Sequence, residues 1–262
     1  MRIIFRCIWM LILPPALAGC NSTVAPGGGP AAGNQGASGG SLSAEQSAEI
    51  AVAAARAVAG AVAAIAPIKD LQAIYESGRP QPRCPSLSAE FESSVATITL
   101  DYGTGCKPDA FAAARFSGRA RGSTKLAYNG INYSFEGFAA GDSALGGAVV
   151  GGFTPEGARV KFTVSVNLTP AQDVAVRGSA SVYVGSEGRI TIAEARLSLA
   201  QGDSLRQRVV ITDAVIDGAN SSGLIPSSGT VELSAGGAAN DASTRRMDFT
   251  ASTPIDGAMI SR

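Results

Sequence analysis

A two-residue alternation of apolar and polar side chains constrains this chain more than any other feature. It is clearest between Arg159 and Leu168, where every second residue is Val, Phe or Leu and the residues between them are mostly polar. Successive side chains of a β-strand point to opposite faces, so this pattern predicts a strand with one buried and one wet face. Similar runs occur near residues 95–102, 114–121, 124–128, 131–140, 145–151, 174–184, 189–200, 207–216, 229–235, 245–251 and 257–261.

Short turn signals separate these runs. They include Asn129-Gly130, Glu187-Gly188 and Asp217-Gly218, which are dipeptides typical of tight turns. A parallel crossover needs a dozen or more residues, so connections this short predict antiparallel neighbours. We therefore expect a mainly β domain over residues 79–262, built as an antiparallel sandwich, a barrel or a curved meander sheet.

An alanine-rich helical segment is expected before the β domain, over residues 42–78. Ser43 and Gln46 have the spacing of a capping box, and Pro67 should end the helix. Apolar residues that should share one face are Ile50, Ala54, Val58, Val62 and Ile65. Charged residues that argue against a membrane span are Glu45, Glu49 and Arg56. The helix either packs on the β domain or self-associates as a stalk, which the small alanine side chains would allow.

The first twenty residues resemble the signal peptide and lipobox of a bacterial lipoprotein. Leu17-Ala18-Gly19-Cys20 has the lipobox pattern and follows a short apolar core and a basic leader. The resemblance implies that residues 1–19 are cleaved as a signal peptide and that Cys20 carries diacylglycerol and further acyl chains such as palmitate. The apolar core is well short of the roughly 20 residues that span a bilayer.

The residues after Cys20 should tether the protein to a membrane of the cell envelope. Residues 20–41 are rich in Gly, Ala and Pro and hold too few bulky apolar side chains for a core. A flexible chain of this length reaches about 25 Å. Asn21 follows the lipidated position, where aspartate would hold many lipoproteins at the inner membrane. We therefore expect an outer-membrane lipoprotein that faces the periplasm.

The cysteines indicate an oxidising compartment. Of the four cysteines, Cys7 leaves with the leader and Cys20 carries lipid, so Cys84 and Cys106 remain to form a disulfide. A zinc site is disfavoured because the chain has no histidine. Cys84-Pro85, followed by residues 97–106, is similar to a segment of uncharacterised secreted or lipid-anchored bacterial proteins, and this supports the bridge and the strand.

The absence of histidine also excludes Ser-His-Asp and Cys-His catalysis. Gly202-Asp203-Ser204-Leu205 matches the string of GDSL esterases, but it lies late in a β region, so we interpret it as a turn. Weak candidates for a glycosidase pair are Glu90, Glu92 and Asp101, and a poor match to a calcium loop is Asp213, Asp217 and Asn220. We predict no enzyme activity, no catalytic or metal-binding residues, and no cofactor besides the lipid on Cys20.

Three arginines form a candidate surface contact. Arg115, Arg119 and Arg121 share one parity of a predicted strand. They either meet anionic lipid or cell-wall polymer, or belong to a solvated face balanced by acidic neighbours. The formal net charge of zero speaks against a nucleic-acid partner.

Two classes of function stay open at this point. In the first, the domain is a structural or protein-interaction module with an envelope protein as partner. In the second, it carries an apolar ligand in a curved sheet, with the alanine-rich helix as plug or lid.

Overall fold

The protein is described from a computed structural model. The structure describes residues 44–70, 83–125, 129–170, 174–201, 205–235, 244–250 and 259–261. The signal peptide, the lipobox and the tether lie outside the described residues, as do Gly202, Asp203 and Ser204 of the esterase-like string.

Twelve strands form one antiparallel sheet in which spatial order follows sequence order from β1 to β12. The fold is therefore mainly β, as predicted, and of the three predicted architectures it is the meander, with β1 and β12 as its two edges. The strands are β1 (Ser86–Glu92), β2 (Val95–Cys106), β3 (Phe116–Lys125), β4 (Gly130–Ala140), β5 (Ser143–Glu156), β6 (Arg159–Pro170), β7 (Val174–Gly185), β8 (Arg189–Gln201), β9 (Leu205–Asp217), β10 (Ser228–Ala235), β11 (Arg245–Phe249) and β12 (Met259–Ser261).

Two predictions about strands need correction. Residues 114–121 and 124–128 were expected as two runs, but Phe116–Lys125 is one strand, β3. Strand β1 was not predicted, because its side chains are mostly exposed and its alternation is weak. It forms through its pairing with β2, whose alternation is strong.

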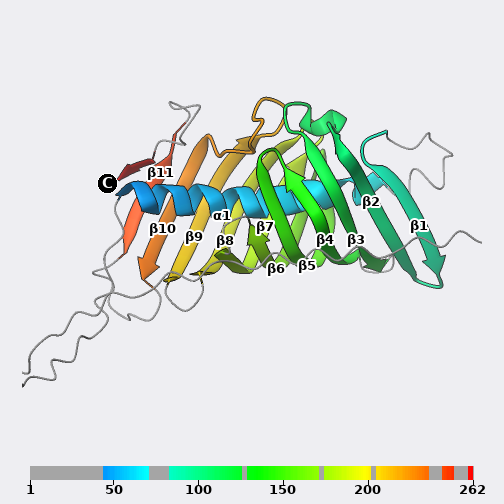
Figure 1. The fold of residues 1–262 in the computed structure, drawn as a ribbon, viewed down its shortest axis with the longest axis horizontal. Helices are drawn as coiled ribbons and strands as arrows, with labels where there is room; N and C mark the ends of the chain where they lie inside the picture. Colours follow the sequence, from blue (N-terminus) through cyan, green and yellow to red (C-terminus); the bar gives the residue numbers. More distant parts are fainter. Residues whose placement is uncertain are drawn as a thin grey trace, which may run out of the picture. The chain divides into compact units, whose positions relative to one another are not determined.

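Among the described residues, one α-helix, α1 (Ala44–Ile65), lies across the strands on the concave side of the sheet (Figure 1). It contacts the strands from β3 to β10. At a rise of 1.5 Å per residue, a helix of 22 residues is about 33 Å long. Eight neighbouring strands span a similar distance, about 34 Å at the usual spacing of 4.8 Å. As predicted, the α-helix ends before Pro67, which lies in the 3₁₀ turn η1 (Ala66–Asp70).

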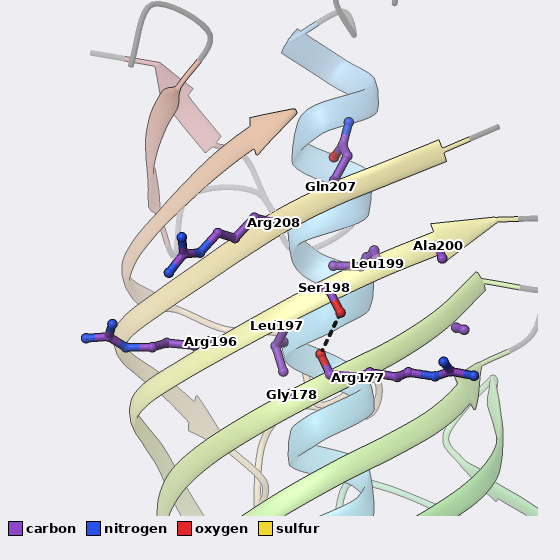
Figure 2. A pocket seen from close by; sticks show the side chains of 10 residues that line it. Arg177, Gly178, Arg196, Leu197, Ser198, Leu199, Ala200, Gln207 and Arg208 are labelled. Atoms are coloured by element: carbon purple, nitrogen blue, oxygen red, sulfur yellow. Dashed lines mark hydrogen bonds between the residues drawn. The ribbon is translucent and has the colours of Figure 1, made fainter. Parts of the chain in front are cut away.

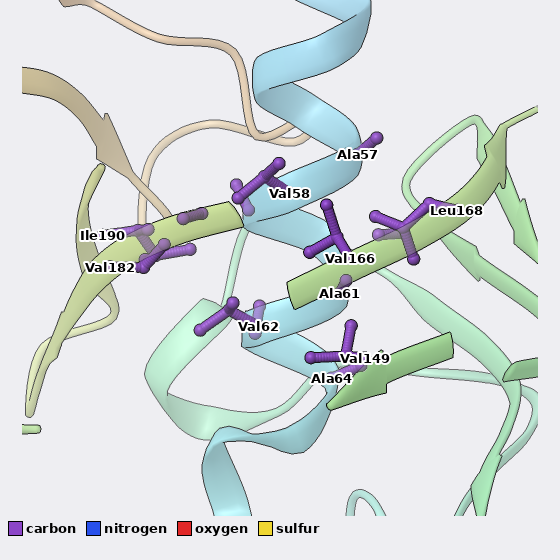
Figure 3. Packing of buried hydrophobic residues seen from close by; sticks show 14 of the residues in the cluster. Ala57, Val58, Ala61, Val62, Ala64, Val149, Val166, Leu168, Val182 and Ile190 are labelled. Carbon is purple, nitrogen blue, oxygen red and sulfur yellow. The ribbon is translucent and has the colours of Figure 1, made fainter. Parts of the chain in front are cut away.

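The helix is buried more completely than a one-sided apolar stripe predicts. Ala53 is exposed in its first half, but every residue from Ala57 to Ile65 is buried. Figure 3 shows Val58 and Val62 of α1 among apolar side chains of the strands, including Val166 and Val182. By length and composition Glu45–Asp70 could cross a membrane, yet 72% of its most apolar window is buried inside the protein. The segment is thus the centre of the core.

Loops at one end of the sheet complete this enclosure. The segment between β9 and β10 buries Leu224, and its Ser222 carbonyl lies close to Gly141 in the β4–β5 turn. In the β7–β8 turn, the carbonyl oxygen of Gly188 accepts a hydrogen bond of 3.1 Å from the N–H of Gly218. The segment from β9 to β10 therefore reaches the β4–β5 and β7–β8 turns at the same end of the sheet.

Glycines on the concave face let neighbouring strands approach closely. A Cβ atom added at Gly122, Gly147, Gly151 or Gly178 would lie 2.0–2.1 Å from a carbonyl oxygen of the next strand. No larger residue fits there without moving the backbone, and inward glycines of this kind allow a sheet to bend sharply. The sheet can therefore curve around α1.

Aromatic residues pack where α1 ends. The hydroxyl of Tyr102 donates a hydrogen bond of 2.7 Å to the carbonyl of Ala64 in the last turn of the helix. Its ring makes edge-to-face contacts with Phe116 and Phe138, at centroid distances of 5.4 and 5.5 Å. The predicted disulfide is present, since the sulfur atoms of Cys84 and Cys106 lie 2.04 Å apart and join the chain before β1 to the end of β2.

Two buried tyrosines, Tyr102 and Tyr133, predict a loss of stability at high pH. Burial raises the pKa of Tyr102, and burial raises the pKa of Tyr133 to about 12, although its hydrogen bond with Thr124 acts in the opposite direction. An unfolded tyrosine has a pKa of about 10. The stabilisation from the raised values is therefore complete below about pH 10 and is lost as the pH rises through the folded values. We expect the free energy of unfolding to fall between about pH 10 and 12.

Absorbance of the phenolate, followed together with circular dichroism, measures this effect. Two of the five tyrosines should ionise together with unfolding, and Tyr102→Phe should remove one of them. This substitution also leaves the Ala64 carbonyl without its partner, which costs about 1–3 kcal/mol. Reversible ionisation of all tyrosines near pH 10 in the folded protein would contradict the expectation.

Candidate interaction surface

Polar side chains line the convex face of the sheet, opposite α1. Two neighbouring rows of paired residues cross it from β2 to β9, and we call them together the convex band. The first row is Thr99, Arg121, Ser134, Ala148, Asn167, Arg177, Ser198 and Arg208. The second row is Thr97, Ser123, Asn132, Val150, Ser165, Ser179, Arg196 and Val210. None of these residues is a carboxylate, so the band carries positive charge.

A groove in the convex band lies over β7, β8 and β9. It has a volume of about 650 Å³, and three of its lining residues are Arg177, Arg196 and Arg208. Figure 2 shows these arginines on three neighbouring strands, with α1 behind them. We call it the β8 groove.

Hydrogen bonds order part of this groove. The Nε atom of Arg177 donates to Oδ1 of Asn167 at 3.1 Å, and the hydroxyl of Ser198 donates to the Arg177 carbonyl at 3.2 Å. Nε of Arg196 lies 2.6 Å from Oε1 of Glu194, an exposed carboxylate in the next row. Arg177 is therefore positioned by a neutral partner and keeps its charge for a ligand.

A smaller groove of about 320 Å³ lies over β2, β3 and β4, and we call it the β3 groove. Arg121 supplies its positive charge, and the hydroxyl of Ser134 donates to the Arg121 carbonyl at 3.2 Å. The remaining lining residues are Thr97, Gly122, Ser123 and Asn132. Both grooves thus combine arginine with serine, and the β8 groove is also lined by the apolar residues Ala175, Leu197, Leu199 and Ala200.

The same glycines that let the sheet bend also line the grooves. Gly122 lines the β3 groove and Gly178 lines the β8 groove, and both approach the next strand closely on the concave side. Where backbones converge on the concave side of a sheet, side chains on the convex side spread apart. The curvature needed to surround α1 therefore also explains the two hollows on the outer face.

Small apolar residues separate the two grooves. Ala148 and Val150 lie on β5 in the two rows of the band, and Val150 is 49% exposed. The surface between the two charged grooves is therefore less polar than the grooves themselves.

The three arginines of the predicted ladder have different surroundings. Arg115 precedes β3, and its Nη2 atom donates to the carbonyl of Thr104 at 3.3 Å. Nε of Arg119 lies 2.8 Å from Oδ2 of Asp101 in an ion pair, and Glu136 stands opposite Arg119 on β4. Of the three, Arg121 lines a groove.

The structure explains the weak carboxylate candidates as local features. A hydrogen bond from the Gly103 N–H, followed by one from Arg119, lowers the pKa of Asp101. The carboxylate of Asp217 accepts hydrogen bonds from Asn220 Nδ2 at 2.7 Å and from the Ala219 N–H at 3.1 Å, in a turn. No group of three or more His, Cys, Asp or Glu side chains suited to a metal occurs in the described part of the chain.

Sequence reasoning missed Arg177, Arg196 and Arg208. Their alternation with buried residues marks them as outward-facing, but they lie on three different strands. Only the register of β7, β8 and β9 shows that they line one groove.

No protein-family model, curated protein or solved structure matches this chain.

Proposed function

We propose that this chain is a non-catalytic lipoprotein of the cell envelope, held at the outer membrane by an acylated Cys20. Its β domain serves as a structural or protein-interaction module that faces the periplasm. The observation that carries this proposal is the position of α1, which occupies the concave side of the sheet. The convex band is then the surface that a partner can bind.

The packing of α1 favours a module over a carrier of apolar ligands. Val58, Val62 and Ile65 have no exposed surface, and they pack within the same core as the inner side chains of the strands. A ligand in this space would have to displace the helix and its contacts. Since each fully buried valine or isoleucine contributes about 1.5–3 kcal/mol, such a displacement would be opposed strongly.

A non-catalytic role fits the chemistry of the surface. The chain has no histidine, and the polar residues that line the two grooves are arginine, serine, threonine, asparagine and glutamine. These residues bind anions and hydrogen-bonding groups, but they provide no base or nucleophile with an activating partner.

Cys20→Ser tests the anchor. Serine cannot form the thioether that precedes cleavage of a lipoprotein leader, so we expect an unlipidated, unprocessed protein. Detergent partitioning and intact mass should show the loss of acyl mass and a retained leader. The matched control is Cys7→Ser, which changes a cysteine within the leader and should leave lipidation intact. A Cys20→Ser variant with wild-type acyl mass and a cleaved leader would overturn the anchor assignment.

A further inference from the structure

We propose that the convex band binds an extended acidic segment of a partner protein, with acidic side chains in the β3 groove and the β8 groove. This inference rests on the proposed function, because it names the partner that an interaction module of this kind would take. A protein segment is favoured by the charge of the β8 groove, by the distance between the two grooves and by the apolar centre of the band.

The charge of the β8 groove suits carboxylates. A guanidinium offers five N–H donors, and Arg177 uses the one on Nε for Asn167. Arg196 shares its charge with Glu194, whereas no ion pair of Arg208 is found among the described residues. Arg177 and Arg208 stand on either side of Ser198 in the same row, and their side chains point in opposite directions along the strands (Figure 2). Each can therefore bind a carboxylate of its own, as a pair of neighbouring acidic residues would supply. Arginine binds a carboxylate through two parallel hydrogen bonds.

The spacing of the grooves suits an extended chain. Four strand spacings separate Arg121 on β3 from Arg177 on β7, or about 19 Å along the sheet. An extended peptide advances about 3.3 Å per residue, so about six residues connect the two positions. A segment with acidic residues about six positions apart would therefore reach both grooves.

The centre of the band favours a protein over a polyanion. Val150 is half-exposed between the grooves, with Ala148 beside it in the neighbouring row. Protein interfaces commonly combine an apolar centre with arginine anchors, whereas a polyphosphate chain or a lipid headgroup gains nothing from an exposed valine. The expected segment therefore has small or apolar residues between its acidic ends.

Fluorescence polarisation with labelled peptides tests the proposal on the full chain in detergent. The long probe has about ten residues, with two glutamates at each end and Ala, Val and Gly between them. The short probe is one half of it, with a single glutamate pair. Because the long probe can occupy both grooves at once, we expect it to bind at least about tenfold more tightly than the short one.

Three variants locate the binding. Arg177→Gln combined with Arg208→Gln should weaken both probes by at least about tenfold. Arg121→Gln should weaken the long probe and leave the short probe within about twofold. The control is Arg159→Gln, which also removes one positive charge. Arg159 is the first residue of β6, and its guanidinium carbon lies 4.3 Å from the centroid of the Tyr183 ring. This control should change neither affinity by more than about twofold.

Several results would overturn the proposal. They are the absence of binding, equal affinity for the two probes, and equal weakening by the control. Vesicles with anionic phospholipid and inorganic polyphosphate serve as competing probes. Tighter binding of either one than of the long peptide would replace the protein segment by a phosphate-bearing ligand. A failure here leaves the Cys20→Ser result unaffected, so it is distinguishable from a failure of the proposed function.

Discussion

Val62→Asp should lower the free energy of unfolding by about 3–5 kcal/mol, or prevent folding. Val62 has no exposed surface and lies in the half of α1 that is buried all round. A carboxylate there would be desolvated with no partner, which is among the most destabilising single changes in a protein core. Thermal and urea unfolding of the full chain, followed by circular dichroism, measure the effect on the helix and the sheet together.

Ala53→Asp is the matched control, since Ala53 is exposed in the first half of α1. It should cost less than about 1 kcal/mol. An unchanged melting temperature for Val62→Asp, together with increased uptake of an apolar dye, would contradict the filled core. That result would make α1 a lid and the carrier function the better proposal.

Gly178→Ala should destabilise the domain by several kcal/mol. The added Cβ atom would lie 2.0 Å from the carbonyl oxygen of Arg196, and Gly178 has a φ of +152°, which side chains rarely adopt. Gly122→Ala separates the two effects, because the same 2.0 Å approach to Asn132 occurs there without a positive φ. Urea unfolding midpoints measure both changes.

Gly146→Ala is the control for this pair. It lies on β5 of the same sheet, and an added Cβ atom would meet its nearest neighbour, the Thr169 carbonyl, at an ordinary 3.7 Å. We expect a change within about 0.5 kcal/mol. If Gly122→Ala and Gly178→Ala changed the free energy of unfolding as little as this control, the sheet would not need glycine at these positions in order to curve.

The strands were largely predictable because a period of two is a local property. The segment Arg159–Pro170 shows this, since its inner residues alternate without interruption and all of them are buried. Strand β1 was not predictable in this way, because its burial pattern is mostly exposed and β2 provides its pairing.

The place of the helix was only partly predictable. The stripe containing Val58 and Val62 predicted one buried face. Burial of the other faces depends on strands from β3 to β10, most of which lie far away in sequence. The periodicity of the helix cannot predict burial by residues that lie far away in sequence.

The candidate surface depended even more on tertiary structure. Arg121 was identified from its parity on one strand, but whether an arginine is paired depends on the neighbouring strands, as Arg119 and Asp101 show. Arg177 and Arg208 come to line one groove through the pairing of β7, β8 and β9. A register shift of one residue would turn these side chains to the other face, so the site exists only once the register is fixed.

Hydrogen exchange of the amides from Ala57 to Ile65 tests the central claim most directly, since it asks whether α1 is an integral part of the core. If α1 fills the concave side permanently, these amides should exchange by global unfolding, with the same protection as the central amides of β6, β7 and β8. Addition of an apolar dye or lipid should leave this protection unchanged. Exchange of the helix amides by a separate opening several kcal/mol below global unfolding, accelerated by the dye, would contradict the account.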